Sequence, residues 1–262
     1  MSVFLGDRTL SRDPPAGTWS SAALVLALAL AIVLIAAAAG FGAAAAFDAW
    51  ARIDEPRAFA AGEMTALLTA RVTLSLVVFQ CVTILLVFLA NARLRFPDTS
   101  FLPFQMPLGG ARTLALAVLA LLVLAGIYGG LVYSVDKQAF SHDIEPFAEM
   151  MKSRTWWLLL LAAGVGAPLA EECLFRGLLY GALRRTPFGM TGAALLTAVM
   201  WALLHANYSA YGLVAITLIG LYLAFLRERT GTLVTPIVCH GAYNSLIVLA
   251  LAFAPDNFLS VG

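Results

Sequence analysis

Seven long apolar stretches constrain the fold more than any other feature of this sequence. They cover about residues 19–46, 64–91, 113–134, 155–183, 190–206, 210–226 and 232–254. A helix needs roughly 20 apolar residues to cross the hydrocarbon core of a bilayer. Hydrophobic residues make up 61% of the chain and charged residues only 12%, whereas a soluble domain carries about a quarter charged residues. The sequence therefore predicts an all-α, polytopic membrane bundle of about seven, or eight, transmembrane helices.

The first apolar stretch and the basic residues predict how the chain sits in the membrane. The stretch begins near Trp19 and stays uncharged to Phe47, which is longer than the 7–15 apolar residues or so of a signal peptide. We therefore expect a retained helix. Lys and Arg are more frequent in the segments that share a side with the N-terminus, and this bias places the N-terminus in the cytoplasm. The formal net charge of +1 does not suggest a nucleic-acid partner.

The remaining segments carry weaker expectations. Residues 95–110, rich in Pro and Gly, and the polar residues 135–154 are predicted to be loops. Four apolar side chains of the first loop are expected to dip into the membrane interface: Phe101, Leu102, Phe104 and Met106. Arg71 is expected to snorkel toward lipid headgroups. Two GxxxG pairs are expected to allow close helix packing, namely Gly126–Gly130 and Gly177–Gly181.

Three charged residues interrupt the apolar stretch GVGAPLAEECLFRGLLYG at positions 164–181. An ionisable group near the bilayer centre costs at least about 2.5–3.5 kcal/mol, so such residues suggest a functional site. Glu172 and Arg176 are four residues apart on one helical face, which favours an ion pair. We expect this pair to support the site by setting the rotation of the helix and the local field. Glu171 points about 100° away and needs a partner from another helix.

Three other polar residues lie deep in later apolar stretches. His205, His240 and Asn244 lie roughly 24, 14 and 20 Å from the span ends that should share one membrane face, and Glu171 lies at roughly 20 Å. A single buried histidine is ordinarily a packing residue that bonds to a backbone carbonyl. Unrelated polar residues would have no reason to reach overlapping depths. The sequence therefore predicts that these four residues share one site.

The same residues carry a resemblance to a known family. The segment APLAEECLFRG resembles the EExxxR motif of the CAAX-protease and bacteriocin-processing family, also called the CPBP or ABI family. WALLH is similar to its second motif, FxxxH, and HGAYN matches its third, HxxxN. The resemblance covers about residues 155–250. Trp201 stands where the second motif usually has Phe.

The resemblance implies an enzyme: an intramembrane endopeptidase that hydrolyses a peptide bond in a membrane-anchored or lipidated substrate. It also implies a glutamate-dependent reaction without a cofactor. On this interpretation residues 151–262 form a catalytic membrane domain of the CPBP type, and residues 1–150 supply N-terminal membrane helices and loops to the same unit. We expect an integral, multi-pass protein of the bacterial cell (inner) membrane, with the lipid bilayer around it.

The residue types suggest a reaction scheme. Glu171, with His205, would hold and deprotonate a water molecule, which is general-base catalysis. The resulting hydroxide would attack the peptide carbonyl. His240 and Asn244 lie one turn apart and would donate hydrogen bonds to the developing oxyanion.

Three alternatives remain open at this point. In a zinc-dependent version, Glu171, His205 and His240 would bind the metal, although the usual HExxH signal is missing. A non-catalytic immunity or scaffold protein could keep the same fold. A proton-coupled transporter also uses buried carboxylates and histidines, but the sequence shows no repeat symmetry of the kind many transporters have.

Overall fold

Every element of regular secondary structure in the described part of the chain is a helix. The computed structural model describes residues 18–54, 64–93, 101–151, 153 and 155–254. The elements in chain order are α1 (Trp19–Asp54), α3 (Met64–Arg93), α4 (Gly110–Val135), α5 (Lys137–Met151), α6 (Trp156–Leu161), η2 (Ala162–Gly166), α7 (Ala167–Glu172), η3 (Cys173–Leu179), α8 (Tyr180–Leu183), α9 (Gly189–Leu203), α10 (Ala210–Thr230) and α11 (Val234–Ala252).

Six of these helical segments are long and apolar enough to cross a membrane. They are α1, α3, α4, the continuous run from α6 to α8, α10 and α11. Helix α9 is also apolar but has only 15 residues, about 22 Å at 1.5 Å per residue. The seven elements correspond to the seven predicted stretches, so the predicted all-α, multi-pass membrane bundle is confirmed.

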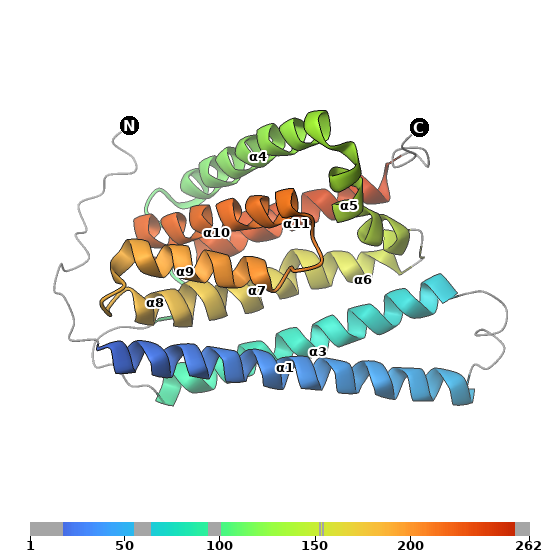
Figure 1. The fold of residues 1–262 in the computed structure, drawn as a ribbon, viewed down its shortest axis with the longest axis horizontal. Helices are drawn as coiled ribbons and strands as arrows, with labels where there is room; N and C mark the ends of the chain where they lie inside the picture. Colours follow the sequence, from blue (N-terminus) through green and yellow to red (C-terminus); the bar gives the residue numbers. More distant parts are fainter. Residues whose placement is uncertain (1–17, 55–63, 94–100, 152, 154, 255–262) are drawn as a thin grey trace.

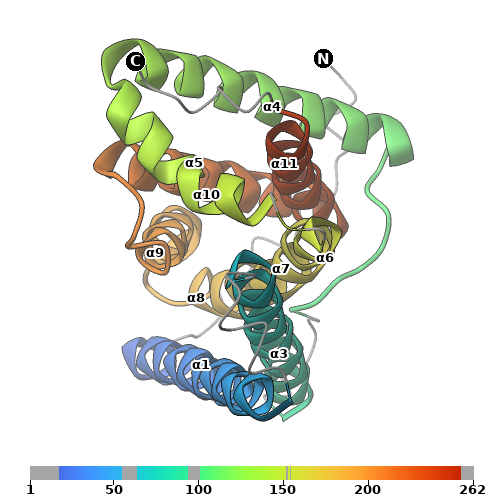
Figure 2. The same ribbon diagram turned by 90° about the vertical axis from the view of Figure 1, so that its right-hand side faces the viewer.

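The run from α6 to α8 lies in the middle of the bundle (Figures 1 and 2). Helices α1 and α3 pair along their length on one side of it. Helices α9, α10 and α11 lie on its other side, and α4 packs on the outside of α10 and α11. The run therefore contacts most of the other helices, and polar groups placed on it can meet partners from several of them.

Residues 135–154 are not the polar loop that the sequence predicted. Lys137–Met151 form the helix α5, which is polar on average but amphipathic. Its apolar residues recur at helical spacing, and Ile144, Phe147 and Met151 pack in a cluster with Val248 of α11. The prediction failed because mean polarity hides a one-sided apolar stripe.

The described part of the other predicted loop, residues 101–109, contains no helix; residues 95–100 lie outside the described part. Phe101 and Leu102 do not dip into the interface, since they are only 3% and 6% exposed. A Cβ atom on Gly181 would lie 2.8 Å from the Phe101 ring, and one on Gly177 would lie 2.6 Å from Leu102. This glycine pair therefore receives loop side chains, and the predicted helix packing at this site was wrong.

One smaller expectation was also wrong. A Cβ atom on Gly126 or Gly130 would meet nothing within 4 Å among the described residues, so this pair mediates no close packing there. Arg71 has a protein partner that the sequence did not predict: its Nε lies 2.9 Å from a carboxylate oxygen of Asp48 on α1.

Candidate functional site

Two π-helical segments interrupt the central run on either side of the paired glutamates. The segment η2 ends just before α7, which carries Glu171 and Glu172 at its C-terminal end, and η3 begins directly after them. A π-helical turn widens the helix and shifts the register of its backbone hydrogen bonds. Such turns frequently lie at functional sites. The sequence-based reading assumed an uninterrupted α-helix.

Side chains from two other helices bind the carbonyl groups of η2. The carbonyl of Ala162 accepts a hydrogen bond from the backbone N–H five residues later. It also accepts a hydrogen bond from Nε2 of Gln80 on α3 at 3.0 Å. In the same register, the carbonyl of Ala163 would accept the amide of residue 168, but Pro168 has no N–H. Nδ2 of Asn244 donates to this carbonyl at 2.9 Å instead. Asn244, predicted as an oxyanion donor, therefore docks α11 on the central run.

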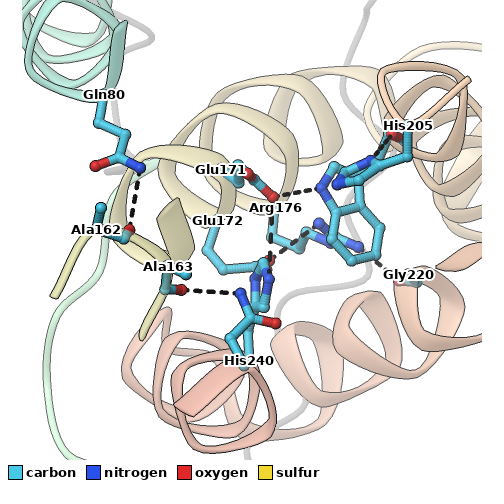
Figure 3. A network of polar contacts seen from close by, with 11 residues as sticks. Gln80, Ala162, Ala163, Glu171, Glu172, Arg176, His205, Gly220 and His240 are labelled. Carbon is cyan, nitrogen blue, oxygen red and sulfur yellow. Dashed lines mark hydrogen bonds and ion pairs between the residues drawn. The ribbon is translucent and has the colours of Figure 1, made fainter. Parts of the chain in front are cut away.

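Glu172 and Arg176 form the predicted ion pair, with 3.1 Å between Arg176 Nη1 and Glu172 Oε1 and both side chains 0% exposed. The same Glu172 oxygen lies 3.0 Å from Nδ1 of His240 on α11. Arg176 Nη2 donates to the carbonyl of Gly220 on α10 at 3.0 Å. The guanidinium carbon lies 4.6 Å from the centre of the Trp201 ring on α9. The pair thus connects four helical segments (Figure 3).

Glu171 finds the partners from other helices that the sequence required. Its Oε2 accepts the indole N–H of Trp201 at 2.6 Å and lies 4.0 Å from Nε2 of His240. The Glu171 side chain is 21% exposed, whereas that of Glu172 is 0% exposed. Glu171 is therefore the carboxylate that a substrate or a water molecule can reach.

His205 lies at the same site but not in the predicted helical setting. The sequence placed it inside a span that continues to residue 206, whereas α9 ends at Leu203 and His205 follows in a turn. Its Nδ1 lies 3.0 Å from the carbonyl of Trp201. Because a carbonyl only accepts, this nitrogen carries the hydrogen, which leaves Nε2 as an acceptor in the neutral ring. Among the described residues, His240 and not His205 is the imidazole at ion-pair distance from Glu171.

Tyr208 is a further polar residue beside the site. Its ring centre lies 5.8 Å from that of His205 in an edge-to-face arrangement. Burial raises the pKa of Tyr208, and the nearby Tyr243, Asp143 and Glu171 raise it further. Its hydroxyl group therefore keeps its proton at neutral pH.

Sequence reasoning missed the contributions of Trp201 and Gln80. It treated Trp201 only as an aromatic substitute for Phe, although a buried indole N–H usually finds a hydrogen-bond partner. That rule could have directed attention to Glu171, an acceptor without a partner in its own helix. Gln80 gave no comparable signal, because its partner is a backbone carbonyl whose availability depends on the π-helical register.

In the zinc alternative, Glu171, His205 and His240 would have to gather as ligands of one ion. In the part of the chain that the structure describes, no three side chains of the His, Cys, Asp and Glu types gather as metal ligands. We therefore derive no reaction step through a metal ion.

Comparison with known proteins supports the resemblance found in the motifs. Residues 153–246 match the model of the family described as "Type II CAAX prenyl endopeptidase Rce1-like". This range contains all the predicted site residues. The predicted resemblance to the CAAX-protease family is therefore confirmed over this region.

Two curated relatives match a similar share of the chain. The first, "Putative membrane peptidase YdiL" from Bacillus subtilis (strain 168), is 30% identical over 103 residues, which are 39% of this chain and 41% of the relative. The second, "Uncharacterized 24.3 kDa protein" from Escherichia coli, is 35% identical over 94 residues, 35% of this chain and 43% of the relative. The matched region thus spans about two fifths of each relative. No solved structure gives a significant match.

Proposed function

From the family match over residues 153–246 and the geometry of the site, we propose that this protein is an intramembrane endopeptidase. It hydrolyses a peptide bond in a membrane-anchored or lipidated substrate. One observation carries the proposal: Glu171 presents a partly exposed carboxylate within a membrane helix, between the indole N–H of Trp201 at 2.6 Å and the imidazole of His240 at 4.0 Å. A carboxylate this deep in a membrane protein is costly without a function.

In the proposed reaction Glu171 acts as the general base. Its Oε2 is occupied by Trp201, and no described residue donates a hydrogen bond to Oε1, so Oε1 can bind the water molecule. The acceptor Nε2 of His205 takes a second hydrogen of this water. Oε1 removes one proton, the hydroxide attacks the carbonyl carbon, and Glu171 later returns the proton to the leaving amine.

His240 and Asn244 stabilise the oxyanion in this scheme. The Nδ1 of His240 is held by the buried carboxylate of Glu172, so a protonated ring can donate from Nε2 on the side that faces Glu171. Nδ2 of Asn244 carries two hydrogens, of which one is used by Ala163 and the other is available. Hydrogen-bond donors aimed at the developing charge are worth about 10²–10³ each in turnover.

The decisive experiment is a comparison of membrane-fraction proteomes from cells with the wild type, Glu171→Gln and a matched control. Glu145→Gln on α5 serves as the control, because it removes the same charge at an exposed position. We expect uncut precursors to accumulate only in Glu171→Gln, since loss of a general base lowers turnover about 10²–10⁴-fold. The precursor that accumulates identifies the substrate, and comparison with its processed form in wild-type cells locates the cleavage site.

One result would overturn the proposed activity, and another would overturn its metal-free mechanism. Normal processing in Glu171→Gln, with the variant present at the wild-type level, would indicate a non-catalytic immunity or scaffold protein. With the purified enzyme, we expect cleavage to survive exhaustive chelation. Loss of cleavage on chelation that zinc restores would favour the metal-dependent version.

A further inference from the structure

We propose that Trp201 is a positioning residue whose indole N–H holds the Glu171 carboxylate in the orientation that binds water. This inference rests on the proposed function of Glu171 as general base. The role depends on the N–H group of the indole and not on the aromatic ring alone.

The contact orients a group that is otherwise free to turn. The terminal torsion of a glutamate side chain is broad, so a carboxylate at the end of three torsions has no single preferred direction. The Trp201 N–H lies 2.6 Å from Glu171 Oε2, and Nε2 of His240 lies 4.0 Å from the same oxygen. Both neighbours thus engage Oε2, and this arrangement leaves Oε1 for the water molecule.

The indole itself is held from several sides. Trp201 is only 3% exposed, and the Arg176 guanidinium lies over it at 4.6 Å. The rings of His205 and His240 meet it edge-to-face, with centroid distances of 5.4 and 5.2 Å. A Cβ atom on Gly220 would lie 3.1 Å from the indole, so a side chain there would press on the ring. Because these contacts hold the indole in place, its N–H can hold the Glu171 carboxylate in one orientation.

The N–H group, and not the ring, is the part that acts on Glu171. A phenyl ring at position 201 would keep the apolar contacts and much of the contact with Arg176, but it would have no hydrogen to donate. A hydrogen bond to an ionised acceptor is about twice as strong as one between neutral groups, so the indole favours the carboxylate form that can accept a proton. The other titratable groups around Glu171 are Glu172 and Arg176 on its own run, His205 and Tyr208 after α9, and His240 on α11. Helix α3, which also packs on this run, contributes the uncharged Gln80.

The hydrogen bond can be tested without any measurement of cleavage. The chain has five tryptophans, so the protein labelled with 15N at the indole nitrogens should give five indole N–H resonances in lipid nanodiscs. We expect one of them to move with pH as Glu171 takes up a proton, and to lose this movement in Glu171→Gln. Its absence from the spectrum of Trp201→Phe assigns it. An unchanged Trp201 resonance in Glu171→Gln would overturn the inference, and Trp201 itself is intact in both of the proteins compared.

The consequence for the reaction is a shift of the pH profile. In Trp201→Phe we expect the acidic limb of kcat/KM to move to higher pH by about one unit or more, from the usual worth of a hydrogen bond to a charged group. Trp157→Phe is the matched control, because Trp157 lies outside the site on α6 and is 50% exposed; it should leave the limb in place. A lower kcat with no movement of the limb would indicate a merely structural role and overturn the inference.

The two proposals fail in different ways. If cleavage is the same in the wild type and in Glu171→Gln, the proposed protease function is wrong, and with it the role of Trp201 in water activation. If Glu171→Gln abolishes cleavage but leaves the Trp201 resonance unchanged, the protease function is supported and the positioning role of Trp201 is wrong.

Discussion

The buried pair of Glu172 and Arg176 permits the sharpest test of how this site is held together. Consider Arg176→Met, which keeps an unbranched apolar side chain and removes the guanidinium. The substitution removes three contacts at once: the ion pair with Glu172 at 3.1 Å, the hydrogen bond to the Gly220 carbonyl at 3.0 Å and the contact with the Trp201 ring at 4.6 Å. It leaves Glu172 as a buried charge whose remaining partner among the described residues is His240.

Two magnitudes compete in this prediction. Ordinary hydrogen bonds between membrane helices are worth only about 0.6 kcal/mol on average. Removal of one partner of a buried ion pair costs about 3–5 kcal/mol, because the other charge stays buried and uncompensated. Both side chains here are 0% exposed, so the charge effect should dominate. We expect Arg176→Met to lower the free energy of unfolding by about 3–5 kcal/mol.

A double substitution separates the charge effect from lost packing. Among the described residues, Glu172 Oε2 and Arg176 Nε have no hydrogen-bond partner, so the pair is not ideally satisfied. Neutralising both members with Glu172→Gln and Arg176→Met should therefore recover about 2 kcal/mol of the loss or more, since buried pairs can often be replaced by neutral residues at little cost.

Reversible unfolding in mixed micelles, with increasing sodium dodecyl sulfate, measures these differences. Arg71→Met is the matched control, because its ion pair with Asp48 has side chains 40% and 30% exposed and should be worth about 1 kcal/mol or less. The reasoning is refuted if Arg176→Met costs no more than Arg71→Met, or if the double substitution costs the sum of the two single ones.

Two further predictions concern the docking of α11 on η2. A Cβ atom on Gly241 would lie 2.6 Å from the carbonyl oxygen of Gly164, so Gly241→Ala should destabilise the protein by about 1–3 kcal/mol. Gly126→Ala is the control, because a Cβ atom there meets nothing within 4 Å among the described residues, and it should leave the stability unchanged. The same unfolding assay compares the two variants. Asn244→Leu removes the hydrogen bond to the carbonyl of Ala163 and should cost about 1 kcal/mol, together with a turnover loss of about 10²–10³ in the cleavage assay if its second hydrogen serves the oxyanion. Equal stability of Gly241→Ala and Gly126→Ala, or of Asn244→Leu and the wild type, would contradict the packing described here.

The sequence by itself determined the long apolar helices and the placement of charge within them. Lipid offers no hydrogen-bond partners to an open backbone, so each apolar stretch had to become a helix. The spacing of Glu172 and Arg176 predicted their pair because residues four apart share a helical face. The lack of a local partner for Glu171 correctly required one from another helix.

Only the tertiary structure decided which groups meet. His240 lies between both glutamates, Trp201 donates to Glu171, and Asn244 binds a carbonyl of η2. These contacts depend on the rotation of each helix and on the π-helical register of the central run, and neither follows from residue spacing. Rotation and register are set by how side chains of neighbouring helices interlock, which is a property of the packed bundle and not of any single stretch of sequence.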